Sequence, residues 1–163
     1  MDQIDTLDIK ARREAAQIFR NFLNGKITND DFENQMPTTH DRAIDAIWDT
    51  AWLFYDDFKT HHLKGRYAMP SDQKRACIRW ILFLHSSLEY KWPDLYLPGW
   101  DPSLRIKKSF WQRIFSLDAL PTDKAKAFLC SGHYAVWPFI SVIDYKSALS
   151  NPTLLSGRSR PLP

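Results

Sequence analysis

Hydrophobic residues recur every three to four positions in the first part of the chain, which is the period of a helix with one buried face. Over 5–24 these positions are Leu7, Ala11, Ala15, Ile18, Phe19 and Phe22. Gly25 follows, where a glycine commonly ends a helix. The pattern predicts a first helix over 5–24. Thr28 with Asp31 resembles a capping box and predicts a short second helix that stops before Pro37.

Two longer helices are predicted in the middle of the chain. The first covers 41–63, is closed by Gly65, and has as its apolar stripe Ile44, Ile47, Trp48, Ala51, Phe54, Tyr55 and Phe58. The second opens at Pro70 and Ser71 and covers about 72–90. Its apolar residues occupy more than half of the helix circumference: Ala76, Cys77, Trp80, Ile81, Phe83, Leu84 and Leu88. This width predicts a central helix that is buried on most sides.

Proline and glycine interrupt the pattern in the last part of the chain. Residues 92–102 hold three prolines and a glycine among aromatic residues, which predicts a loop that packs on the body. Helices are predicted over 103–116, 122–130 and 141–149, and 134–140 is predicted to be a turn, an irregular segment or a short strand. We therefore predict an all-α fold, with one compact helical domain over 1–150 built around the helix at 72–90. Residues 151–163 are expected to form a mobile tail.

Several strings of this sequence resemble a set of small uncharacterised bacterial proteins. They are NGKITNDDFE (24–33), RWILFL (79–84) with LEYKWP (88–93), and VWPF (136–139). The resemblance covers about residues 11–149 and rests on motifs that are structural in character. It implies a bacterial source and brings no activity with it.

Composition excludes several classes of protein. Seven Trp, ten Phe and six Tyr in 163 residues are too much apolar surface for a disordered chain. Cys77 and Cys130 both lie in apolar helical patterns, so we expect two reduced core cysteines. The longest apolar run is far shorter than the roughly 18 residues that a membrane span needs, and the charged N-terminal region lacks a secretory signal, so a cytoplasmic location is expected. Five scattered glycines form no phosphate-binding loop, and no cofactor is expected.

Charge is divided unevenly along the chain. Residues 1–60 hold 7 basic and 12 acidic side chains, a net charge of −5, whereas residues 61–163 hold 15 basic and 7 acidic ones, a net charge of +8. Such a division serves either an external partner or mutual neutralisation when the two halves pack together.

The predicted helix over 41–63 concentrates acidic residues beside its apolar stripe. Asp41, Asp45 and Asp49 follow one another at i,i+4 spacing, where like charges repel, and Asp56 extends the same stripe. Arg75 and Arg79 of the next helix could neutralise these carboxylates inside the protein. A basic protein partner is the second possibility, with Trp52 as an apolar anchor.

A metal ion is a third possible counter-charge, and it leads to an enzyme as the alternative function. The carboxylates lack the Glu-x-x-His spacing that completes helical metal sites. Other candidate ligands or catalytic groups of a metal-dependent or hydrolytic enzyme are His61, His62, His85 and Glu89, with Asp57 placed to orient His61. The helix dipole alone also favours histidines at the end of a helix, so these residues do not decide between a metal or catalytic site and a purely structural role.

A third class of function is nucleic-acid binding. Arg105, Lys107, Lys108 and Arg113 lie in a stretch without acidic residues and alternate with Phe110 and Trp111. Segments that bind nucleic acid have this composition, because their cations contact phosphates and their aromatic rings stack on bases. The same aromatic residues are equally suited to a buried helix face, and nucleic acid is the less favoured partner.

These observations favour a non-catalytic bacterial protein that binds a basic protein. The most concrete form is an immunity protein that neutralises a toxin domain. The expected contact residues are Asp41, Asp45, Asp49, Trp52 and Asp56, which would present negative charge at helical spacing around an apolar anchor.

Overall fold

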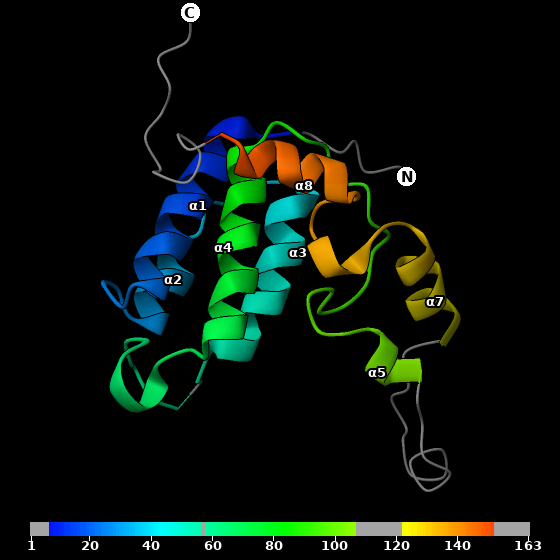
Figure 1. The fold of residues 1–163 in the computed structure, drawn as a ribbon. Coiled ribbons are helices and arrows are strands. Elements are labelled where there is room, and N and C mark those ends of the chain that lie inside the picture. Colours follow the sequence, from blue (N-terminus) through cyan, green and yellow to red (C-terminus); the bar gives the residue numbers. More distant parts are fainter. Residues whose placement is uncertain (1–6, 57, 107–121, 152–163) are drawn as a thin grey trace, which may run out of the picture.

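Three helices lie side by side and form the body of the protein in a computed structural model (Figure 1). The structure describes residues 7–56, 58–106 and 122–151. α1 (Ile9–Leu23) and α3 (Arg42–Ala51) begin at the same end of the body, and α4 (Ser71–His85) runs in the opposite direction. Within these residues the regular elements are all helical, which confirms the predicted all-α fold.

The first two helices begin and end at the signals found in the sequence. α1 begins four residues later than predicted, because the Asp8 carboxylate caps it by accepting from the Ala11 N–H at 2.9 Å. Gly25 follows its end with φ +61°, a conformation that glycine adopts at little cost. The capping box predicted from Thr28 and Asp31 is present at α2 (Asn29–Gln35).

The predicted central helix is confirmed. α4 buries Cys77 and the five consecutive residues Trp80, Ile81, Leu82, Phe83 and Leu84. It packs most extensively against α1, where the ring of Phe19 stacks on Trp80 with 6.0 Å between centroids. The helix ends at His85 rather than near residue 90, because the Ser86 backbone is extended and the Ser86 hydroxyl donates to the Phe83 carbonyl oxygen at 2.6 Å.

The predicted extent of the third helix, 41–63, is wrong. α3 ends at Ala51, a 3-10 turn covers Trp52–Phe54, and the backbone is extended at Tyr55. The cause is the buried side chain of Asn29, which donates to the carbonyl oxygens of Asp56 and Lys59, both at 3.2 Å, and accepts from the His61 N–H at 2.7 Å. This amide holds the backbone of Asp56, Lys59 and His61 in place, and Phe58, predicted to lie in the core, is 94% exposed.

The remaining helices pack beside and across the end of this body. α5 (Ser103–Ile106) and α7 (Thr122–Cys130) lie to one side, and α8 (Val142–Leu149) crosses the end near the last turn of α4 (Figure 1). The 134–140 segment forms a 3-10 helix over Tyr134–Val136 and then a turn with a cis Trp137–Pro138 peptide, so it is not a strand. The predicted helix over 103–116 is described only as far as Ile106, and the predicted tail only at Asn151.

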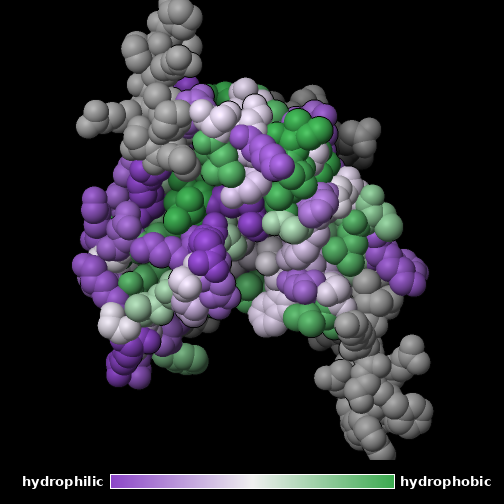
Figure 2. Space-filling view, in the orientation of Figure 1, coloured by the Kyte–Doolittle hydropathy of each residue, from purple (hydrophilic) through white to green (hydrophobic). Residues whose placement is uncertain are grey.

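The surface divides into an apolar and a polar region on the face drawn in Figure 2. Hydrophobic side chains gather over α8, where Ile143 is 79% exposed, while the α1 side is largely hydrophilic. Cys77 is buried as predicted, but Cys130 ends α7 at an exposed position, so the prediction of two core cysteines is half wrong.

Candidate acidic pocket

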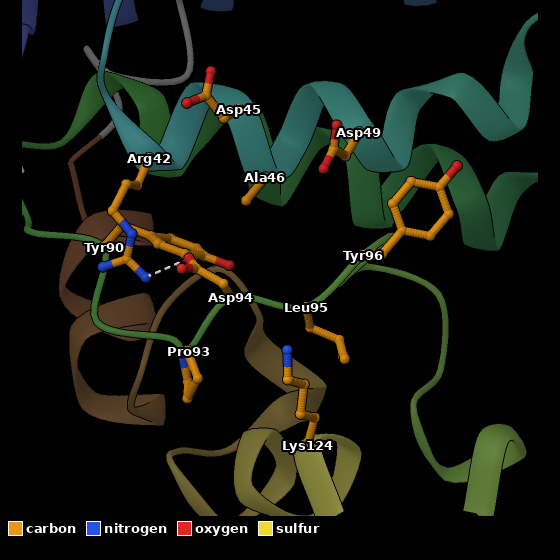
Figure 3. A pocket seen from close by; sticks show the side chains of 10 residues that line it. All are labelled: Arg42, Asp45, Ala46, Asp49, Tyr90, Pro93, Asp94, Leu95, Tyr96 and Lys124. Carbon is orange, nitrogen blue, oxygen red and sulfur yellow. Dashed lines mark hydrogen bonds and ion pairs between the residues drawn. The ribbon is translucent and has the colours of Figure 1, made fainter. Parts of the chain in front are cut away.

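A pocket of about 430 Å³ opens between α3, the segment that follows α4 and the first turns of α7 (Figure 3). α3 contributes Asp45 and Asp49, which are one helical turn apart, and in Figure 3 the carboxylate of Asp45 is turned away from Tyr90 and Asp94. The irregular segment contributes Tyr90, Pro93, Asp94, Leu95 and Tyr96, and α7 contributes Lys124. Two of the predicted aspartates therefore share a concave site with residues more than forty positions away.

Asp45 and Asp49 are the charged groups of the pocket wall. Within the described residues, neither carboxylate takes part in a hydrogen bond or an ion pair. Asp45 is exposed at the surface. Partial desolvation raises its pKa, the charges of Asp49 and Asp41 raise it further, and the nearby His40 lowers it. Burial also raises the pKa of Asp49. The free protein thus holds two adjacent negative charges that its own structure disfavours.

Arg42 and Lys124, the two cationic residues that line the pocket, form no ion pair with Asp45 or Asp49. The Arg42 guanidinium donates to the Asp94 carboxylate at 2.8 Å and to the Trp92 carbonyl oxygen at 2.9 Å. In Figure 3 Arg42 turns toward Asp94 at one end of the pocket, and the Lys124 ammonium lies near Leu95, across from α3. The wall formed by Asp45 and Asp49 remains open to a further cation.

Aromatic surface adjoins the two carboxylates. Tyr90 is buried and its hydroxyl accepts from the Trp137 indole N–H at 3.2 Å, so the position of its ring is fixed by the core. Tyr96 is 63% exposed at the opposite end of the site. Carboxylates beside tyrosine rings favour an organic cation, because charge pairing and contact with the ring faces act together.

Asp41 lies outside this pocket, contrary to the expectation that it belongs to an exposed acidic stripe. It caps α3 and is fully buried, with its carboxylate accepting from the Arg12 guanidinium at 2.6 and 2.9 Å. Arg12 also donates to the Leu88 carbonyl oxygen. Asp41 is therefore part of the protein interior, and its counter-charge comes from α1.

Trp52 and Asp56 do not continue the stripe either, because α3 ends before them. Trp52 is 38% exposed and its ring contacts Trp48 and Tyr55, with centroids 5.4 and 4.7 Å away. The Asp56 carboxylate accepts from the Phe58 N–H at 3.0 Å. The structure thus reduces the predicted stripe to Asp45 and Asp49, with Trp52 three residues further along the chain.

Arg75 and Arg79, the predicted internal counter-charges, lie elsewhere. Arg75 is exposed on α4. The Arg79 guanidinium donates to the Trp137 carbonyl oxygen at 2.7 Å, and burial lowers its pKa. The described part of the structure contains no ion pair between either arginine and the acidic residues of α3.

The candidate metal ligands do not converge. His61 is buried below Tyr67, its ring centroid 4.4 Å from that of the tyrosine, and its Nδ1 lies 3.0 Å from the Lys59 carbonyl oxygen. His62 and Glu89 are exposed. His85 ends α4, where burial and then Arg20 and Arg13 lower its pKa. Among the described residues no three His, Cys, Asp or Glu side chains are grouped for a metal ion, and Asp57 lies outside them.

The basic residues proposed for nucleic-acid binding are described only in part. Arg105 is half-buried and donates to the Leu97 carbonyl oxygen at 2.9 Å, and burial lowers its pKa. Lys107, Lys108 and Arg113 lie outside the described residues. Arg105 therefore joins α5 to the backbone at Leu97, and its Nη1 is buried without a hydrogen-bond partner among the described residues.

Several pocket residues were not singled out in the sequence. Tyr90, Asp94, Tyr96 and Lys124 have no periodic relation to α3, and only the aromatic composition of 92–102 indicated that this segment packs on the body. Arg42 and Asp94 are 52 positions apart in the chain. A contact of that separation leaves no local pattern from which the pocket could be derived.

The raised pKa of Asp49 predicts a stabilising substitution. Because folding disfavours the charged carboxylate, the free energy of unfolding of the unmodified protein increases as pH falls through the raised folded-state pKa toward the ordinary value of 3.8. Asp49→Asn should therefore raise the thermal midpoint at about pH 7, and this advantage should shrink toward about pH 4. Thermal unfolding across this range, with the exposed Glu14→Gln as control, measures it. A lower midpoint for Asp49→Asn at about pH 7 would contradict the prediction.

Comparisons with known family models, with curated proteins and with solved structures find no match to this chain. No helix in the described ranges is both long enough and apolar enough to cross a membrane. The pocket is therefore interpreted from its own geometry and chemistry.

Proposed function

We propose that this protein binds a basic protein partner, and that the acidic pocket receives an arginine or lysine side chain of that partner. The observation that carries the proposal is the adjacent pair Asp45 and Asp49, which lines a concave site without a counter-ion from the described residues. The most concrete form is an immunity protein that neutralises a basic toxin domain in the cytoplasm of a bacterium.

The energetics of the pair support a cationic ligand. Partial burial disfavours both charges in the free protein, the charge of Asp49 raises the pKa of Asp45, and an arriving cation offsets this repulsion. A guanidinium group can donate to the Asp49 carboxylate while its flat face contacts a tyrosine such as Tyr96. Removing one partner of such a charge pair typically costs about 2–5 kcal/mol of binding free energy.

The surface around the pocket adds to this proposal. Trp52 is partly exposed three residues after Asp49, and Tyr96 stands at the rim. Partly exposed tryptophan and tyrosine are the residue types that contribute most at protein interfaces. Asp41 and Asp56 have no place in the proposed contact, because one is buried and the other lies beyond the end of α3.

The combined substitution Asp45→Lys with Asp49→Lys is expected to abolish partner binding while the fold stays intact. The tagged protein is used to capture partners from its source cells at about 50 mM salt, and the captured protein is then purified and titrated by calorimetry. We expect one stoichiometric basic protein, whose affinity falls with increasing salt and is lost in the double variant. In the immunity form, co-expression should also protect cells from the purified partner's activity.

The control for this experiment is Glu14→Lys, which reverses an exposed charge on α1, away from the pocket. This variant should bind the partner as the unmodified protein does. A partner that still binds the double variant with unchanged affinity would overturn the proposal. Circular dichroism and the thermal midpoint show whether each variant is folded, so that loss of binding is not confused with loss of structure.

A further inference from the structure

α1 and α4 pack side by side in opposite directions (Figure 1), and a cavity of about 240 Å³ opens between them at the protein surface. The floor of this cavity is apolar, because the buried side chains of Leu23, Ile81 and Leu82 line it. Ile78 also lines the cavity and is 44% exposed. The volume is below that of an ordinary small-molecule site, so the cavity suits a single large side chain of a partner.

Basic side chains follow this cavity along both helices, and we call the cavity with its cations Arg13, Arg20 and Lys74 the α1–α4 groove. Arg20 of α1 and Lys74 of α4 line the cavity itself. Arg13 is exposed seven positions before Arg20, a spacing that places both residues on the same face of α1. Burial lowers the pKa of His85 at the end of α4, and the charges of Arg20 and Arg13 lower it further. The positive field of the groove therefore extends to the last residue of α4.

The two helix faces that border the groove carry no acidic residue. Glu14 is exposed on α1, but it lies about 100° around the helix from Arg13. The residues at helical spacing along the groove are Arg13, Gln17, Arg20 and Asn24 on α1, and Lys74, Ile78, Ile81 and His85 on α4. An apolar cavity between cations is complementary to an apolar side chain between carboxylates.

We infer that the α1–α4 groove binds an acidic amphipathic helix of a partner protein. One large apolar side chain of that helix fills the cavity, and carboxylates on either side of it pair with Lys74 and Arg13. α1 and α4 are each 15 residues long, so a partner helix of about four turns can lie along them.

The lining of the groove favours a helix over other anionic partners. The cavity has no aromatic ring on which a nucleic-acid base could stack. Its apolar residues are mainly a buried floor, whereas binding to a lipid surface needs apolar side chains that project from the protein. The inference is independent of the proposed basic partner, because Asp45 and Asp49 do not line this cavity.

Three matched peptides of about 15 residues test this proposal. The first has leucines at positions i, i+3, i+4 and i+7 and glutamates on either side of them. The second has glutamine in place of each glutamate, and the third has alanine in place of each leucine. We expect the first peptide to bind with a Kd of about 0.1 mM or lower at about 50 mM salt, and each of the others to bind about tenfold more weakly. Fluorescence anisotropy of labelled peptides measures the affinities, and proton–nitrogen NMR should show saturable shifts of the Ile78 and Leu82 amide signals.

Matched variants separate the groove from general attraction between a basic protein and an acidic peptide. Lys74→Glu should weaken the first peptide about tenfold. Lys126→Glu makes the same change of charge at an exposed position on α7 and should leave the affinity unchanged.

Three results would overturn the proposal. The first is equal affinity for the glutamate and glutamine peptides, and the second is an equal effect of Lys74→Glu and Lys126→Glu. The third is that phosphatidylglycerol vesicles or single-stranded RNA bind through Lys74 while the first peptide does not bind, which would assign the cations to a lipid surface or to a nucleic acid.

Discussion

Asp41→Ala is expected to lower the free energy of unfolding by about 3–5 kcal/mol, the cost of breaking a buried ion pair by removing one partner. The Asp41 carboxylate accepts from the Arg12 guanidinium at 2.6 and 2.9 Å, and it caps α3 by accepting from the Ala43 N–H at 3.0 Å. It also accepts from the Asp8 N–H at 3.0 Å. Alanine would leave a buried guanidinium without its counter-charge and α3 without its cap.

Chemical denaturation measures this loss, and two further variants identify its cause. Asp41→Asn keeps an oxygen for the Ala43 N–H but removes the charge, so it should lose less stability than Asp41→Ala. Arg12→Met combined with Asp41→Ala should cost less than the sum of the two single substitutions, because neither charge is then buried alone. A loss below about 1 kcal/mol for Asp41→Ala would show that the pair is not buried as described.

Trp92→Ala should produce a loss of similar size, about 3–5 kcal/mol. Trp92 is fully buried, its ring stacks on Phe128 of α7 with 4.6 Å between centroids, and its indole N–H donates to the Pro138 carbonyl oxygen. Alanine would remove the largest side chain that joins the 90–96 segment to α7 and to the 134–140 turn. The acidic pocket should open as a consequence, because Tyr90 and Pro93 are held beside Trp92.

Two controls show which part of Trp92 matters. Trp92→Phe retains a ring against Phe128 but leaves the Pro138 carbonyl oxygen without its donor, so it should cost about 1–3 kcal/mol. Trp100→Ala removes an indole that is 45% exposed in the same segment and should cost less than half as much as Trp92→Ala. Denaturant titration of the four proteins measures the series, and equal losses for Trp92→Ala and Trp100→Ala would contradict the packing described here.

Most of the helices could be predicted because their signals are local. The capping box at Thr28, the glycine after α1 and the broad apolar face of α4 each depend on residues within a few positions of one another. The end of α3 could not be predicted in this way. The end of this helix depends on the side chain of Asn29, which binds backbone atoms about thirty positions away in the chain. The apolar pattern, by contrast, continues to Phe58 and therefore predicts a longer helix.

The candidate site follows the same division between local and distant contacts. Asp45 and Asp49 were found because they repeat at helical spacing on one element, and the structure places both in one pocket. Asp41 obeys the same spacing but is the N-cap residue directly before α3, where its carboxylate turns back to the backbone and to Arg12. A spacing rule alone does not distinguish a cap from a member of an exposed stripe.

Two cavities of the structure have linings that differ in chemical character. The acidic pocket is lined by Asp45, Asp49 and Asp94, whereas the cavity lined by Leu53, Phe54, Trp80 and Trp100 is mainly apolar. Thr50 connects them structurally: it is buried one residue after Asp49, and its hydroxyl accepts from the Gly99 N–H at 3.0 Å.

The buried Arg12 also bears on how the protein is made. Arg12 belongs to α1, and its guanidinium donates to the Asp41 carboxylate at the start of α3 and to the Leu88 carbonyl oxygen after α4. A nascent chain that has emerged only as far as α3 can supply the first of these acceptors but not the second. The ribosome must release α4 and Leu88 before the guanidinium is fully satisfied, so the N-terminal helices should consolidate only after more than half of the polypeptide has been synthesised.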